Sequence, residues 1–313
     1  MAQLSKTVEP FGEVNVYKQP NGDVEIVATI LMVPDIEGAK TGLALDASAS
    51  MKKMYGVSGI VASSIFGGAT GFPNVVEPVA RTMAAYLANF SSDGKTNLIY
   101  WACSPDGSQI EEIGEFDATQ AQAVAINGVK PHLWGRGTKL LPPVKHFVDD
   151  KFKDAKWGIV IFVTDGIIED LDDVKKFCLQ FGQQISAGQR HFIKLVLIGV
   201  GEEVDEGQME ELDDMFEGSG LKDPEGNDID LWDHKLASEM KKIEEIFAEV
   251  VSENTIVAAS GRALNNAGQV VKDYPDGVPA LLRFTLPAGS TGFTLEFPGG
   301  SVTQDITEGL ARP

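Results

Sequence analysis

The sequence predicts an α/β protein with a doubly wound, mostly parallel sheet and a small β-rich domain built from the two ends of the chain. Two observations predict this class. From about residue 42 onward, apolar runs alternate with segments of helical periodicity, as in successive strand–helix units. Both ends of the chain carry short β-rich runs instead. We therefore divide the chain into 1–37, 38–253 and 254–313.

The first segment is predicted to form a β-hairpin. "EVNVYK" and "VEIVATILMV" are rich in β-formers, and "QPNGD" between them is a strong turn signal. A lone hairpin is barely stable in water, so it needs a further sheet to pair with. Residues 254–313 offer such strands in "ALLRFTLP", "GFTLEF" and "SVTQDI". We expect the two ends to share a sheet, as a small β-sandwich.

The middle segment carries the predicted parallel sheet. Its runs beginning at residues 43, 158 and 192 are continuously apolar, which suits strands covered by helices on both faces. Helical periodicity is expected in "NVVEPVARTMAAYLANF", "ATQAQAVAINGV", "KLLPPVKHFVDDKF", "DLDDVKKFCLQFGQQI", "EGQMEELDDMF" and "KLASEMKKIEEIFAEVV". The last of these places one apolar stripe toward the core, formed by Leu236, Met240, Ile243, Ile246, Phe247 and Val250.

Composition narrows the classes of partner. The 313 residues contain 46 Asp and Glu against 26 Lys and Arg, a formal charge of -20. Such a surface repels phosphate backbones and anionic lipids, so we expect no nucleic-acid or membrane partner. The two cysteines, Cys103 and Cys178, are far apart in apolar or amphipathic runs and are expected to be reduced. The first residues lack the apolar core of a signal peptide, so we expect a cytoplasmic protein.

Polar side chains gather where the predicted strands end. The first apolar run stops at Asp46, and two hydroxyls follow at alternate positions, Ser48 and Ser50. A later run ends in "VTDG" with Asp165, and Thr138 follows "GRG" just before a helix. In open α/β sheets, ligands bind outside the carboxyl ends of the strands. These five residues are therefore the candidate site.

The donors are two carboxylates and three hydroxyls, with no His or Cys among them. Such hard oxygen ligands suit Mg²⁺, with Mn²⁺ or Ca²⁺ as alternatives, rather than zinc. Two simpler interpretations stay open. "DASAS" alone is also a common turn sequence, because Asp and Ser side chains bond nearby backbone. The whole set could also be capping hydroxyls around a metal-free site.

"DASAS", the Thr after "GRG", and "VTDG" resemble the metal-ion-dependent adhesion site (MIDAS) of the von Willebrand factor A (vWA) domain family. The resemblance covers about residues 40–253 and implies a sheet with one antiparallel edge strand, which "NLIYWAC" and "QIEEIGEF" would supply. It implies metal ligation by Asp46, Ser48, Ser50, Thr138 and Asp165. Ala49 stands where the family commonly has Gly. Within the family, the segments "DGIIEDLDDVKKFC", "IKLVLIGVGEE" and "DIDLWD" are similar to those of cytoplasmic bacterial members near tellurium-resistance proteins.

The resemblance implies a non-catalytic, metal-dependent interaction module that binds an Asp or Glu carboxylate of a protein partner through Mg²⁺. The alternatives are an assembly scaffold with a structural metal, or a metal-assisted hydrolase or phosphatase. An enzyme is disfavoured because no G-x-S-x-G elbow, Walker loop or H-E-x-x-H motif is present. The four histidines are scattered along the chain.

The long segment 55–74 follows the two serines directly and is rich in Gly, Ser and Ala. Loops of this length are usually functional or disordered. A flap over the metal, part of a partner surface, and simple disorder are all compatible with its composition.

Overall fold

The computed structural model describes residues 2–30, 38–57, 72–201, 203–224, 226, 228–238, 256–258, 260–275 and 277–311. The chain divides into two compact units, residues 37–248 and residues 1–36 with 249–313. The boundaries expected after residues 37 and 253 lie outside the described residues. So does most of the segment 55–74.

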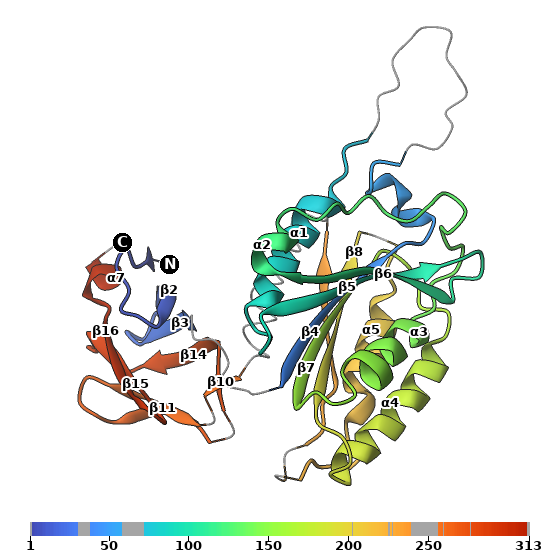
Figure 1. Ribbon diagram of the computed structural model, residues 1–313. Helices are drawn as coiled ribbons and strands as arrows, with labels where there is room; N and C mark the ends of the chain where they lie inside the picture. Colours follow the sequence, from blue (N-terminus) through green and yellow to red (C-terminus); the bar gives the residue numbers. More distant parts are fainter. Residues whose placement is uncertain are drawn as a thin grey trace, which may run out of the picture. The chain divides into compact units, whose positions relative to one another are not determined.

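The larger unit is built around a six-stranded sheet with the strand order β6-β5-β4-β7-β8-β9 (Figure 1). Its strands are β4 (Ala39–Asp46), β5 (Lys95–Cys103), β6 (Gln109–Asp117), β7 (Trp157–Thr164), β8 (Ile193–Val200) and β9 (Trp232–Ala237). Only the β5–β6 pair among them is antiparallel. The predicted fold class, including the antiparallel edge strand, is confirmed.

Helices cover both faces of this sheet (Figure 1). Adjacent residues of β4 show the two layers. The Thr41 hydroxyl donates to the carbonyl of Leu87 in one layer, whereas a side chain at Gly42 would meet the Phe147 ring in the other. The helices are α1 (Val76–Ala88), α2 (Ala118–Ala121), α3 (Leu141–Lys145) with the π-helical turn His146–Lys151, α4 (Leu171–Ser186) and α5 (Glu206–Asp213), and shorter 3₁₀ turns cover Ser50–Lys53 and Asp214–Phe216.

The sheet core is apolar because its central strands are covered on both sides. β7 and β8 are buried at every position. Trp101, Phe162 and Trp232 are among the largest fully enclosed side chains. Both cysteines are free and buried, and Cys178 accepts a hydrogen bond from the Trp232 indole at 3.3 Å. Each large side chain of this kind contributes about 1.5–3 kcal/mol by leaving water.

The smaller unit joins the two ends of the chain. One sheet, β1-β2-β3-β14, contains β1 (Ala2–Gln3), β2 (Phe11–Lys18), β3 (Val24–Ile30) and β14 (Leu281–Leu286). The other, β12-β11-β15-β16, contains β11 (Gly261–Asn265), β12 (Val270–Tyr274), β15 (Gly292–Phe297) and β16 (Gly300–Asp305). The Phe293 ring of β15 packs edge-on against Phe11 and Phe284 of the first sheet, with ring centroids 5.2 and 5.1 Å away.

β3 pairs with β14, so the first and last parts of the chain share a sheet, as expected. Two short strands, β10 (Ile256–Ala258) and β13 (Val278–Pro279), form a separate pair. A short terminal helix, α7 (Thr307–Ala311), was not expected from the sequence. It begins where the Asp305 carboxylate accepts the backbone N–H of Thr307.

Two helix predictions are wrong in part. Only Ala118–Ala121 of the segment 118–129 is helical, since the Ile126 carbonyl accepts from Asn74, which precedes α1, and the Val124 carbonyl accepts from Arg81 of α1, instead of from a helix ladder. Leu236 was expected to begin the last helical stripe. It lies in β9, because Trp232–Ala237 pairs with β8, and it is 40% exposed. The remaining stripe residues lie outside the described ranges.

Candidate metal centre

The candidate site is built where β4 and β7 end side by side. These two strands are parallel neighbours, so Asp46 and Asp165 follow the same edge of the sheet. Asp46 is fully buried and Asp165 nearly so. Parallel pairing thus brings together two carboxylates that are far apart in the sequence.

Hydrogen bonds hold the Asp46 carboxylate in place. It accepts the backbone N–H of Ser48 at 2.6 Å and the hydroxyl of Thr164 at 2.6 Å. The hydroxyl of Tyr55 donates to the Asp46 backbone carbonyl at 3.0 Å. Thr164 and Tyr55 were not anticipated as site residues. Thr164 was visible as the residue before Asp165 in "VTDG", whereas nothing in the sequence links Tyr55 to Asp46.

Two serine hydroxyls connect the first strand end to the second. Ser48 Oγ lies 2.9 Å from Ser50 Oγ, and Ser50 Oγ donates to Asp165 Oδ1 at 2.8 Å. Ala49, between them, has right-handed backbone angles, φ −65° and ψ −26°, which any L-residue adopts readily. An alanine at this position is therefore compatible with the loop.

The Thr138 loop is attached to the serine loop by backbone pairing. The Ala49 N–H donates to the Gly135 carbonyl at 2.7 Å, and the Gly135 N–H donates to the Ala47 carbonyl at 3.1 Å. A side chain at Gly135 would lie 1.9 Å from the Ala102 carbonyl, so only glycine fits this approach.

Thr138 itself is buried beside the second carboxylate. Its hydroxyl lies 3.0 Å from where a Cβ on Gly166 would stand, and Gly166 directly follows Asp165. Within the described ranges, this hydroxyl makes no hydrogen bond, so it is available to a ligand. All five predicted residues therefore lie around one edge of the sheet, and a chain of hydrogen bonds joins Asp46, Ser48, Ser50 and Asp165.

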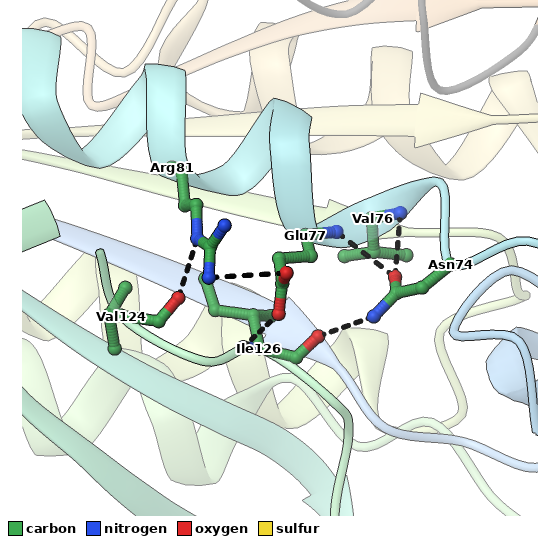
Figure 2. A network of polar contacts seen from close by, with 6 residues as sticks. All are labelled: Asn74, Val76, Glu77, Arg81, Val124 and Ile126. Carbon is green, nitrogen blue, oxygen red and sulfur yellow. Dashed lines mark hydrogen bonds and ion pairs between the residues drawn. The ribbon is translucent and has the colours of Figure 1, made fainter. Parts of the chain in front are cut away.

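Asn74, just before α1, and two side chains of α1 anchor the segment that leads to Thr138 (Figure 2). Asn74 accepts the N–H groups of Val76 and Glu77 at the start of the helix and donates to the Ile126 carbonyl at 2.7 Å. Glu77 accepts the Ile126 N–H at 2.8 Å, and Arg81 donates to the Val124 carbonyl at 2.6 Å. The irregular backbone after α2 is thereby fixed without secondary structure of its own.

The site is electrostatically unfavourable for its own carboxylates. Burial raises the pKa of Asp46 from 3.8 to about 7; hydrogen bonds from Thr164 and Ser48 oppose this, and the charge of Asp165 adds to it. Burial also raises the pKa of Asp165. The hydrogen bond from Ser50 lowers this pKa, and the negative charge of Glu203 raises it further. Glu203, which follows β8, was not anticipated. Two buried carboxylates without a cation favour a bound positive charge.

The donor chemistry fits a hard divalent cation. The candidate set offers carboxylate and hydroxyl oxygens, which Mg²⁺, Mn²⁺ and Ca²⁺ accept. Among the described residues, no group of three or more His, Cys, Asp and Glu side chains could hold a metal, so this part of the chain offers no conventional zinc cluster. None of the described helices is long and apolar enough to cross a membrane.

No family model matches the chain, and no curated protein matches it. Among solved structures, it is similar to the von Willebrand factor type A protein from Catenulispora acidiphila, with 13% identity over 96% of this chain and 73% of that one and a TM-score of 0.44. It is also similar to the pilus adhesin SpaC from Lactobacillus rhamnosus GG in an open conformation, with 12% identity, 97% and 48% coverage and a TM-score of 0.46.

A third similar structure is proximal thread matrix protein 1 from the mussel byssus, described with a zinc-occupied MIDAS motif. It is 14% identical over 72% of this chain and 47% of that one, with a TM-score of 0.39. The chain thus spans about half the length of the adhesin and of the matrix protein. At these identities and TM-scores, no function is transferred from the three proteins.

Proposed function

We propose that this protein is a non-catalytic, metal-dependent protein-interaction module with a vWA-type MIDAS. The observation that carries the proposal is the convergence of Asp46, Ser48, Ser50, Thr138 and Asp165 at one edge of the sheet, with both carboxylates at raised pKa. These five residues would hold Mg²⁺, or Mn²⁺ or Ca²⁺ in its place. A cation held this way would offer a positive charge to an Asp or Glu carboxylate of a partner protein.

The residues of the chain divide this task. Asp46, held by Thr164 and by backbone, places negative charge beneath the site. Ser48, Ser50 and Thr138 add neutral oxygens, so the donor set brings little extra negative charge and leaves attraction for an outside anion. Partner carboxylate binding, a cytoplasmic location and kinship with tellurium-resistance members all belong to this proposal.

Metal binding itself is the first test. We expect titration calorimetry with MnCl₂ to show one site in the wild type and none in Asp165→Ala, because that change removes a carboxylate and the acceptor of the Ser50 hydroxyl. Thr138→Ala should weaken binding by about tenfold, the equivalent of 1.4 kcal/mol. Thr82→Ala, which removes an exposed hydroxyl on α1, is the matched control and should bind as the wild type does.

The variants must keep their fold for this comparison to count, so each is also followed by far-UV circular dichroism. Equal Mn²⁺ affinity in all four proteins would refute the site assignment. An assembly scaffold with a structural metal predicts instead that EDTA lowers the melting temperature but leaves partner binding unchanged. A hydrolase predicts product formation.

A further inference from the structure

Acidic residues are missing from two stretches of this otherwise acidic chain. None of the 46 Asp and Glu occurs in residues 47–76 or 118–148, although at the mean frequency of the chain each stretch would hold about four or five. The first stretch directly follows Asp46, and the second contains Thr138. Two of the three segments that supply the candidate site, the loops with the serines and with Thr138, therefore carry no negative charge.

The fold pairs the two loops that carry Lys52, Lys53 and Arg136. Backbone pairing of Ser48 with Gly135 places the loops side by side. Across this junction, Lys52 Nζ lies 5.7 Å from the ring centroid of Trp134. Arg136 is exposed and adjoins the paired Gly135. We call Lys52, Lys53 and Arg136 the cationic rim of the site.

These cations are available to a partner. Lys53 and Arg136 are exposed, and within the described residues neither forms an ion pair. The Lys53 ammonium lies 4.9 Å from the ring centroid of Phe72, which is itself 49% exposed. Lys139, in contrast, already faces Asp106 at 3.8 Å. Stacking on aromatic rings holds Lys52 and Lys53 in place without neutralising them.

Two acids also lie near the site. Glu203 follows β8 and acts electrostatically on Asp165. Glu169 packs against the loop that carries Arg136, since its carboxylate reaches the position that a side chain on Gly137 would occupy and its N–H donates to the Thr138 carbonyl at 3.0 Å. The charge pattern of a partner segment, as well as its net charge, therefore affects its binding.

We infer that the cationic rim makes this site selective for a protein segment with several clustered carboxylates rather than one isolated carboxylate. The inference rests on the proposed function, because one carboxylate goes to the metal and its neighbours go to Lys53 and Arg136. A charge of -20 would otherwise repel such a partner. The local rim offsets that repulsion where contact is made.

The experiment uses two labelled peptides of equal length, a polyglutamate and a Gly-Ser peptide with a single glutamate. Fluorescence anisotropy gives their affinities in Mg²⁺ and in EDTA. The variant is Lys53→Gln with Arg136→Gln. The matched control is Lys153→Gln, which removes an exposed lysine just before β7, at the other end of the sheet.

We expect polyglutamate to bind at least tenfold more tightly than the single-glutamate peptide in Mg²⁺. The double variant should bind polyglutamate about tenfold more weakly than the wild type does. It removes two cations, and one exposed ion pair changes binding by up to about five-fold. Lys153→Gln should lose almost none. Raising the salt concentration should weaken the wild type more than the double variant.

The outcomes separate the inference from the proposed function. Binding that depends on the rim but not on Mg²⁺ would refute the metal-dependent function and keep the acidic partner. Binding that depends on Mg²⁺ but not on the rim would keep the metal-dependent function and refute the role of the cationic rim. Equal loss in Lys153→Gln, equal affinity for both peptides, or equally tight binding of single-stranded DNA or phosphatidylserine vesicles would overturn the inference.

Discussion

The two ends of the six-stranded sheet bury polar and charged groups in opposite ways. At the amino end, Lys194 is 5% exposed and its ammonium donates to the Asp230 carboxylate at 3.0 Å and to the Trp232 carbonyl at 2.9 Å. At the carboxyl end, Asp46 and Asp165 receive hydrogen bonds only from neutral groups among the described residues. The buried charge at one end is neutralised within the protein, whereas the carboxyl groups at the other end have no cationic partner among the described residues.

This difference separates structural from functional burial. A partner offsets much of the desolvation cost of a buried charge, whereas an unpaired buried charge destabilises the fold until something binds. The carboxyl end of the sheet has the second property. The comparison therefore predicts that variants at the two ends shift stability in opposite directions.

The largest effect is expected for Asp46→Asn in the metal-free protein. The raised pKa of Asp46 means that the folded wild type binds a proton more tightly than the unfolded chain. Its free energy of unfolding should therefore fall as the pH rises from about 4 to about 7. Each pKa unit is worth about 1.4 kcal/mol, so Asn at this position should stabilise the protein by a few kcal/mol at pH 8 and hardly at all below pH 4.

Urea unfolding in EDTA at both pH values measures this difference between wild type and variant. Mg²⁺ should restore stability to the wild type and leave Asp46→Asn unaffected. A variant that is less stable than the metal-free wild type at pH 8 would show that the carboxyl end is compensated after all, and the contrast between the two ends would disappear.

The next effect is expected at the amino end. Lys194→Met keeps the length of the side chain but leaves the Asp230 and Trp232 carbonyls without their donor. The expected loss is about 2–3 kcal/mol of unfolding free energy, from buried acceptors that lose their partner. Mn²⁺ affinity should be unchanged, because Lys194 lies at the opposite end of β8 from the site. Chemical denaturation measures the loss of stability, and calorimetry measures the Mn²⁺ affinity. A large drop in metal affinity would show that the two ends of the sheet do not act independently.

The smallest effect is expected for Tyr55→Phe. This change removes only the hydroxyl that donates to the Asp46 carbonyl, and keeps the ring contacts with Trp134 and Tyr100. The expected loss of stability is about 1 kcal/mol. Because this bond positions the start of the serine loop, Mn²⁺ affinity should fall by about two- to five-fold. The control is Tyr17→Phe, which removes a hydroxyl from β2 of the other unit. An equal loss of Mn²⁺ affinity in this control would show that the Tyr55 hydroxyl does not position the serine loop.

Much of the architecture was readable from the order of residue types. Continuous apolar runs identified β4, β7 and β8, because strands covered on both faces have no polar side. The turn "QPNGD" identified the first hairpin, and β3 pairs with β14 as expected. The predicted helix does not continue after residue 121, because Asn74, just before α1, and Arg81 of α1 donate hydrogen bonds to its carbonyl groups. Periodicity along the chain contains no information about such long-range acceptors.

The sequence by itself determined which residues can form a metal site, since Asp46, Ser48, Ser50, Thr138 and Asp165 stand at the ends of apolar runs or beside glycines. Only the tertiary structure decided how these groups affect each other. Parallel pairing of β4 with β7 buries two carboxylates together and raises their pKa, and close packing at Gly135 joins the loops so that Lys52 meets Trp134. Charge interactions depend on distance and burial in space, which a linear pattern does not encode.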